Sequence, residues 1–448
     1  MQDDRIGPPP SHRRASPLRL RNIAGATGAV LAVAVAAVIV RLASASQPST
    51  SGRRVDSPTN LAPSGAPSPS LSTPTASSQV HVTPDREALE AKVELGRKIF
   101  FDETLSDPPG TSCASCHDPA HGYAGNNGSK VGTARGSRPD HFARRNTPSV
   151  LYLKYVPRFA FRWEEDVNLP DAAGGFFWDG RVDSIAALVR QPLFNPNEMN
   201  ARDAAQVAAK VNAGAYASAF RLAFGAAADD ANTTVAALGT AVEAFLESDT
   251  MAPFTSKYDD FVRGHASLNP LETKGLALFK DRAKGACDAC HRLSEASGKP
   301  ERSLFTDFGF EAVGAPRNLR LAANRDASAF DLGLCERHDH PHMDEERLCG
   351  AFRTPSLRNV AVRQSFMHNG TFSKLRDVVA FYATRGTDPK RWYASGTAFD
   401  DLPAAYRTNV NTDRVPYDRG IGEKPRLDTD EIDAIVAFLQ TLTDAQYR

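Results

Sequence analysis

The chain has 448 residues, of which 53 are basic and 53 are acidic, so its formal net charge is zero. Partners such as nucleic acids usually require an excess of positive charge, and this balance argues against them. Hydrophobic residues make up 41% of the chain, which is sufficient for globular domains with real cores, and the length predicts two or three of them.

The first 84 residues differ in composition from the rest. A basic segment, SHRRASPLRLRN, precedes an uncharged apolar run at 23–40, and the small residues of ASA at 43–45 follow. This order predicts an export signal at 1–45, either cleaved or retained as a membrane anchor, with the rest of the chain outside the cytoplasm. Residues 46–84, rich in Pro, Ser and Thr, are predicted to be a disordered linker. Because a linker has a use where the apolar segment stays in the membrane, we favour a periplasmic protein tethered to the inner membrane.

Four of the six cysteines belong to two Cys-x-x-Cys-His motifs, CASCH at 113–117 and CDACH at 287–291. In an exported protein such cysteines could form a redox dithiol or a disulfide, and zinc would need nearby ligands that neither motif has. The histidine that directly follows is instead the signature of c-type haem attachment, in which the thiols bond the haem and the histidine binds the iron. The sequence therefore predicts two covalently bound haem c groups, held by Cys113, Cys116 and His117 and by Cys287, Cys290 and His291.

The two motifs lie within a weak internal repeat. ELGRKIFFDETLSDPPGTSCASCH is echoed by TKGLALFKDRAKGACDACH, RNTPSVLYL by FRTPSLRNV, and FFWDGRVDSIAALV by FMHNGTFSKLRDVV, where Trp178 and His368 occupy the same place. Segments such as EIDAIVAFLQTL have helical periodicity, and alternating strand patterns are scarce. We expect a mostly α fold with two cytochrome c-like haem domains, 85–265 and 266–448, that face a shared interface.

In chain order, the motifs SCASCHDP, RRNTPSV, FFWDGR, NPNEM, CDACH, FRTPSLRNV, MHNGTF and FYATRGTDPKRWY resemble those of the bacterial dihaem cytochrome c peroxidases, including the MauG-like enzymes. The resemblance extends from about Arg86 to Arg448. It implies an oxidoreductase that reduces hydrogen peroxide at the N-terminal haem, on His117, and receives electrons at the C-terminal haem, on His291. The donor would be a small cytochrome c or a cupredoxin; in the MauG-like alternative, peroxide is used to oxidise a side chain of a partner protein.

The resemblance assigns catalytic roles to two residues. Glu198, in NPNEM, corresponds to a glutamate that moves a proton between the two peroxide oxygens. Trp178, in FWDGR, corresponds to a tryptophan that relays electrons or oxidising equivalents between the haems. Without the resemblance, they would be an ordinary acid at a helix start and an ordinary core aromatic. Ten residues after this tryptophan the family often has glutamine, and Leu188 stands there instead, which leaves the polarity of the pocket open.

The motifs leave two further haem ligands open. Fourteen residues after the position of His368, ordinary members of the family carry a methionine ligand and MauG-like members a tyrosine; here the residue is Tyr382. A thioether raises the reduction potential, whereas a phenolate stabilises ferric and higher states. Met367 is the competing ligand, and we favour Tyr382. His141 could cap the N-terminal haem as a distal histidine does in some members, although its offset from His117 differs from theirs.

The resemblance also implies a calcium ion between the domains. Asn146 matches the family's calcium ligand, and backbone carbonyls near Arg363 and Ser365 would complete the oxygen ligands that calcium prefers. His121 follows the first motif too closely to be assigned a role and is expected at the surface.

The two remaining cysteines, Cys335 and Cys349, flank a charged loop and predict a disulfide in an oxidising compartment. This loop carries a histidine cluster that is either a metal site or a solvated or partner-contacting segment. Its members are His338, His340 and His342.

Three functions remain open. The first is a peroxidase, the second a MauG-like oxidase of a partner protein, and the third a dihaem electron carrier without turnover. A carrier has no use for a carboxylate over an open iron, so Glu198 and Trp178 favour an enzyme. We expect hydrogen peroxide and a redox protein as partners, no nucleic acid, and a monomer or a homodimer.

Overall fold

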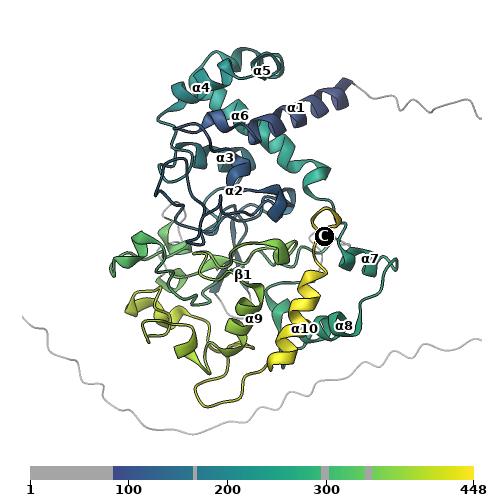
Figure 1. The fold of residues 1–448 in the computed structure, drawn as a ribbon, viewed down its shortest axis with the longest axis vertical. Coiled ribbons are helices and arrows are strands. Elements are labelled where there is room, and N and C mark those ends of the chain that lie inside the picture. Colours follow the sequence, from purple (N-terminus) through teal and green to yellow (C-terminus); the bar gives the residue numbers. More distant parts are fainter. Residues whose placement is uncertain (1–83, 165–168, 294–301, 338, 340–345) are drawn as a thin grey trace, which may run out of the picture. The chain divides into compact units, whose positions relative to one another are not determined.

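The computed structural model describes residues 84–164, 169–293, 302–337, 339 and 346–448. These residues belong to one unit. The predicted export signal and most of the linker lie outside them, as does the histidine cluster. Helices joined by irregular loops, some of them long, make up most of this part of the chain (Figure 1), and strands are few, which confirms the mostly α prediction. None of the helices found there has the length and apolarity needed to cross a membrane.

The N-terminal half is built around a long central helix. Its helices are α1 (Pro84–Phe100), α2 (Cys113–Cys116), α3 (Ile185–Phe194), α4 (Ala204–Ala213), α5 (Ala217–Phe224) and α6 (Ala231–Glu247). Helix α6 begins at Asp230, whose side chain accepts hydrogen bonds from the first turn, and its apolar side packs on α1 and α3. Gly96 allows the close approach of α1, because a Cβ there would lie 1.9 Å from the carbonyl oxygen of Ala241.

The C-terminal half repeats this packing. Its helices are α7 (Lys257–Val262), α8 (Pro270–Lys280), α9 (Leu375–Thr384) and α10 (Thr429–Gln440), and Figure 1 shows α8 beside α10. A Cβ on Gly275 of α8 would lie 1.9 Å from the carbonyl oxygen of Ala434 of α10. Gly96 and Gly275 are the glycines of the two echoed segments ELGRKIF and TKGLALF. The matched glycine contacts support the internal repeat, which stays a prediction.

The strands are short and lie near the junction of the halves. Strands β1 (Ala160–Glu164) and β2 (Leu169–Ala173) pair antiparallel, with Ala160 opposite Ala173. Strands β3 (Phe310–Glu311) and β4 (Phe352–Arg353) form a second antiparallel pair. An isolated bridge between Ala173 and Gly309 connects the two sheets.

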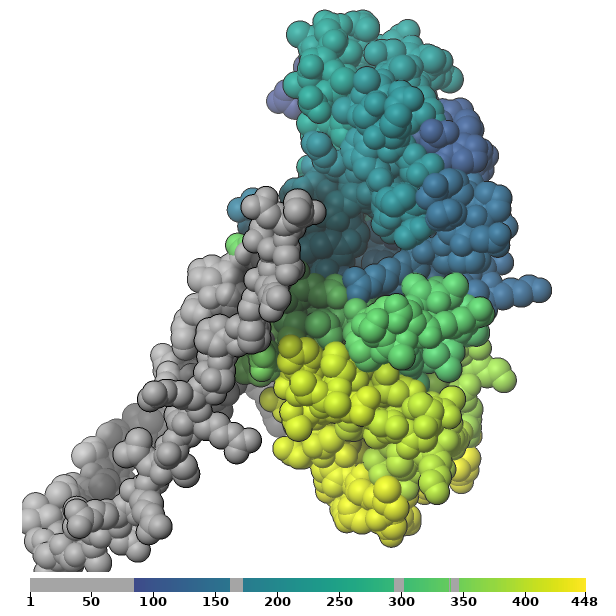
Figure 2. Space-filling view, turned by 90° about the vertical axis from the view of Figure 1, so that its left-hand side faces the viewer, coloured from purple at the N-terminus to yellow at the C-terminus, as the bar shows by residue number. Residues whose placement is uncertain are grey.

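Buried polar contacts hold the two halves together. Near the C-terminus, Asp444 accepts hydrogen bonds from the Tyr152 hydroxyl at 2.5 Å and the Asn359 amide at 2.7 Å. Within the C-terminal half, Arg358 forms a fully buried ion pair with Asp259 of α7 at 2.7 Å, and removing one partner of such a pair typically costs ~3–5 kcal/mol. In Figure 2 the blue and teal N-terminal half meets the green and yellow C-terminal half over a broad contact. The predicted division at residues 265 and 266 is not tested by this arrangement.

Candidate active site

Both Cys-x-x-Cys-His motifs form the same tight turn. The first is α2 and the second is a 3-10 turn at Cys287–Ala289. In each, the backbone N–H of the histidine donates to the carbonyl of the first cysteine at 2.8 Å. This closure places the two thiols and the imidazole of each motif on one short stretch of chain.

The histidines of these turns have the orientation and the protonation state that haem iron requires. His117 Nδ1 lies 3.1 Å from the Tyr123 carbonyl and His291 Nδ1 lies 2.9 Å from the Phe305 carbonyl, which leaves Nε2 of each ring for a metal. Burial lowers the pKa of His117 to about 4 and also lowers that of His291, so both rings are neutral, as iron binding requires.

The four thiols of the motifs are free rather than paired in disulfides. Burial raises the pKa of each to about 12, which keeps it protonated at neutral pH. No group of three or more His, Cys, Asp or Glu suited to a metal ion occurs in the described part of the chain. These features fit thiols that bond haem vinyl groups and do not fit a zinc site.

Each motif borders a cavity. The N-terminal cavity has a volume of about 510 Å³ and is lined by Cys113, Cys116 and His117 together with Leu188 and Glu198. The C-terminal cavity has a volume of about 190 Å³, and its lining is mostly apolar around Cys287, Cys290 and His291. A planar group bonded to the cysteines of each turn would extend into the adjacent cavity.

Glu198 lies in the loop that follows α3 and borders the N-terminal cavity. Burial raises its pKa above the ordinary glutamate value, while the charge of Arg181 and a hydrogen bond from Asn195 act to lower it. The Asn195 amide donates to the Glu198 carboxylate at 2.9 Å. The carboxylate is therefore oriented, and its proton affinity is set by its neighbours.

A second loop fixes the backbone of the Glu198 loop. The N–H of Ser137 donates to the Glu198 carbonyl at 2.7 Å. Gly136 permits this approach, because a Cβ there would lie 2.4 Å from the Asn197 carbonyl oxygen. His141 belongs to the same loop, with Nδ1 3.0 Å from Asn197 Oδ1, and it does not line the cavity. In this arrangement His141 supports the loop, and its role as a cap of the N-terminal haem stays a prediction.

Trp178 borders both cavities. Its side chain is 9% exposed, and its indole Nε1 donates to the Asn146 carbonyl at 2.7 Å. The N–H of Arg353 donates to the Trp178 carbonyl at 2.8 Å. The indole is therefore held in the wall that separates the two cavities.

Tyr382 and Met367 both border the C-terminal cavity, so either side chain lies where it could bind the iron of a haem on His291. Sequence reasoning missed a third candidate, Tyr417, whose ring lies 5.6 Å from that of Tyr382 and which lines the same cavity. Burial raises the pKa of both phenols. Tyr417 follows no motif of the repeat, which is why the sequence offered no signal for it. His368 also lines the cavity and stacks on Phe352 at 3.6 Å.

Asn146 meets the predicted carbonyls, but through its N–H donors. Its Nδ2 donates to the carbonyls of Ser365 at 3.0 Å and Met367 at 3.1 Å. The guanidinium of Arg363 donates to the Thr147 carbonyl at 2.9 Å and brings a positive charge to the same place. Calcium therefore stays a prediction that this arrangement does not support.

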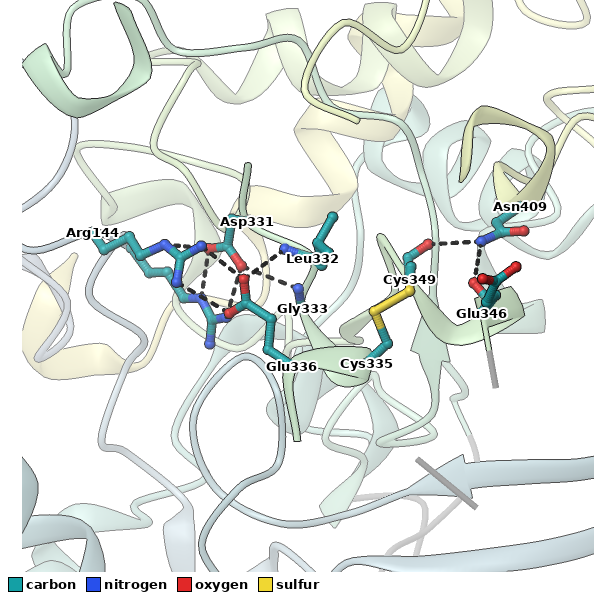
Figure 3. Close-up of a disulfide and its surroundings, with 10 residues drawn as sticks. Arg144, Asp331, Leu332, Gly333, Cys335, Glu336, Glu346, Cys349 and Asn409 are labelled. Atoms are coloured by element: carbon teal, nitrogen blue, oxygen red, sulfur yellow. Dashed lines mark hydrogen bonds and ion pairs between the residues drawn. A yellow bond between two sulfur atoms is a disulfide. The ribbon is translucent and has the colours of Figure 1, made fainter. Parts of the chain in front are cut away.

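The predicted disulfide between Cys335 and Cys349 is present (Figure 3). Asp331 lies four residues before Cys335, and Glu336 directly follows that cysteine. Asp331 holds Arg145 at 2.7 Å, and Glu336 holds Arg144 at 2.8 Å. Asp179 binds Arg145 from the other side at 2.6 Å. This ion-pair network, which the sequence did not predict, forms part of the wall of the N-terminal cavity.

His121, which the sequence predicts at the surface, is partly buried. Its Nδ1 lies 3.1 Å from the Val362 carbonyl, so it contributes to the contact between the halves.

Two turns that present cysteines and a free imidazole nitrogen to two cavities define a c-type cytochrome with two haems. Comparison with known proteins identifies its family. A family model described as di-haem cytochrome c peroxidase matches residues 90–267. The methylamine utilization protein MauG of Paracoccus denitrificans is 35% identical over 371 residues, which cover 81% of this chain and 91% of that protein.

Two further relatives agree with this result. Cytochrome c551 peroxidase of Pseudomonas aeruginosa is 29% identical over 292 residues, or 65% of this chain and 71% of that protein. The crystal structure of the diheme peroxidase BthA from Burkholderia thailandensis matches with a TM-score of 0.75 and 48% identity, covering 80% of this chain and 86% of that one. The chain belongs to the dihaem cytochrome c peroxidase and MauG family. It is a peroxidase-type oxidoreductase with two haem c groups.

We expect Asn195→Ala to move the acid limb of the pH–rate profile for hydrogen peroxide to higher pH by about one unit, since a hydrogen bond to a charged group contributes ~1.5–3 kcal/mol. The Asn195 amide stabilises the ionised carboxylate, so its loss raises the pKa of Glu198 further. If ionised Glu198 accepts a proton, the rate falls as pH drops through that pKa. Stopped-flow absorbance across pH tests this, with the exposed Asn232→Ala as control; superimposable profiles would contradict it.

Proposed function

We propose that hydrogen peroxide is reduced at the N-terminal haem with Glu198 as the group that moves its proton. The observation that carries this proposal is the oriented, half-buried carboxylate at the cavity beside His117. Reduction of one peroxide to two waters consumes two electrons and two protons. When bound, the haem supplies the iron and the electron transfer that break the O–O bond.

Glu198 performs the proton step. The carboxylate accepts the proton of one peroxide oxygen and returns it to the other, which leaves as water. Its pKa, raised by burial, brings the carboxylate nearer to the pH at which it can act in both directions. Leu188 also lines this cavity, so its side chain excludes water where relatives often carry glutamine.

The electron path that we propose passes through Trp178. Its indole borders both cavities and is held by its hydrogen bond to Asn146. Electrons enter at the C-terminal haem, on His291, from a small cytochrome c or a cupredoxin. We assign Tyr382 as the second ligand of that haem's iron, with Met367 as the alternative.

A second candidate function is oxidation of a partner protein's side chain with peroxide as oxidant. Tyr382 in the C-terminal cavity favours it, because a phenolate ligand stabilises the oxidised iron states that such a reaction needs. A purely electron-carrying role would leave Glu198 without a task. We further propose that the protein acts in the periplasm, from the predicted export signal.

Glu198→Gln should slow the reaction with hydrogen peroxide by about a hundredfold or more, the range for a general acid–base group. The amide keeps the size of the carboxylate but cannot accept the proton. Stopped-flow mixing of the fully oxidised and the half-reduced protein with peroxide measures the rate. The exposed Glu94→Gln on α1 is the control, and a fast Glu198→Gln variant would remove Glu198 from the mechanism.

Trp178→Phe should slow oxidation of the C-terminal haem after peroxide reacts at the N-terminal haem. Phenylalanine fills the wall but is harder to oxidise. Trp392→Phe is a matched control, since it also loses one indole hydrogen bond, to Thr384 at 3.0 Å, and lies away from the wall. Rapid-scan absorbance resolves the two haems. If the C-terminal haem is oxidised at equal rates in both variants, Trp178 is not the relay.

Tyr382→Phe should change the absorption and electron paramagnetic resonance signals of the C-terminal haem and leave those of the N-terminal haem unaltered. The change follows from loss of the phenolate ligand. Tyr417→Phe, in the same cavity, should leave both sets of signals in place. If Tyr417→Phe changes the signals and Tyr382→Phe does not, Tyr417 is the ligand; if neither does, the assignment returns to Met367.

A further inference from the structure

Two arginines that line the cavities lack the carboxylate partners that Arg358 and Arg145 have. Arg358 pairs with Asp259, and Arg145 pairs with Asp179 and Asp331. In the part of the chain that the structure describes, no ion pair joins Arg353 or Arg363 to a carboxylate. Both guanidinium groups donate to backbone carbonyls instead. Arg353 donates to that of Phe177 at 3.1 Å, and Arg363 donates to those of Thr147 at 2.9 Å and Ser365 at 3.4 Å.

The two guanidinium groups also differ electrostatically from Arg145. Burial lowers the pKa of Arg353 and of Arg363 to about 10. Although burial acts in the same direction on Arg145, its two aspartates raise its pKa above the ordinary value. An unpaired buried charge is costly, and folded proteins seldom keep one without a partner.

The place of these arginines indicates which partner is missing. Arg353, in β4, borders both cavities, as Trp178 does. Arg363 borders the C-terminal cavity and not the N-terminal one. The groups that enter these cavities are haems, whose propionate side chains are carboxylates. A guanidinium binds a carboxylate through two parallel hydrogen bonds and keeps its charge at every physiological pH.

We propose that Arg353 and Arg363 are binding residues for haem propionates, and that Arg353 serves both haems from the wall between the cavities. Arg363 serves the C-terminal haem. Arg353 also positions the relay, since its backbone N–H donates to the Trp178 carbonyl and its Nε to the Phe177 carbonyl. One positive charge thereby influences the reduction potentials of both irons and holds the tryptophan between them. The inference rests on the attachment of two haems and not on the proposed role of Glu198.

The test is a spectroelectrochemical titration of the holoprotein without peroxide, after haem content has been measured. A nearby positive charge disfavours ferric iron, so its removal moves a midpoint potential to more negative values. Arg353→Gln should shift the potentials of both haems, and Arg363→Gln mainly that of the C-terminal haem. Arg353→Lys keeps the charge and should stay near the wild-type values. Arg376→Gln, which breaks an ion pair with Asp433 on the surface, should shift neither.

Arg353→Gln with both haems attached and either potential unchanged would overturn the shared role. If that variant does not accumulate with both haems, Arg353→Lys and Arg363→Gln test the proposal in its place. Arg353→Lys must then load both haems and keep both potentials, and Arg363→Gln must move mainly the C-terminal one. Failure of either result overturns the proposal. Because the titration contains no peroxide, its outcome is separate from the fate of the proposed peroxidase mechanism.

Discussion

The junction between the halves depends on the hydrogen bonds of Asn146. Its backbone N–H donates to the His368 carbonyl at 2.6 Å, its side chain donates to the Ser365 and Met367 carbonyls, and its own carbonyl accepts from Trp178. One residue of the N-terminal half thus fixes a loop of the C-terminal half and the indole between the cavities. The contacts are buried, so breaking any one would leave a polar group unpaired at a cost of ~1–3 kcal/mol.

This constraint explains why the wall can contain unpaired charge. Backbone carbonyls hold Arg353 and Arg363, and they satisfy hydrogen bonds without neutralising a cation. These hydrogen bonds hold the guanidinium groups in place, and in our proposal the carboxylates that pair with them come with the cofactor. A calcium ion at Asn146 would compete with this arrangement, because Arg363 already donates to the Ser365 carbonyl at 3.4 Å and brings positive charge there.

The sequence predicted the features that depend on neighbouring residues. The spacing of each Cys-x-x-Cys-His motif determines its turn. Glu198 and Trp178 could be singled out because their motifs occur in the order seen in the family, and both residues line the cavities. Contacts between distant segments were not predictable. Tyr417 reaches Tyr382 through a loop without helical pattern, and Arg353 meets Trp178 across 175 positions of chain. The contact of His141 with Asn197 is a further example, because the sequence indicated only that an imidazole there could bind iron.

The two halves share local features but differ in the residues and the space around their cavities. Both halves have the same turn, the same glycine contact between helices and a histidine with one free nitrogen. The N-terminal half adds a cavity of about 510 Å³ with a carboxylate at its edge. The C-terminal half has about 190 Å³ and two phenols, which leaves less room for a second molecule beside a haem. The space and the carboxylate of the N-terminal cavity favour our proposal of peroxide chemistry at its haem. The tighter C-terminal cavity favours electron exchange at the second haem.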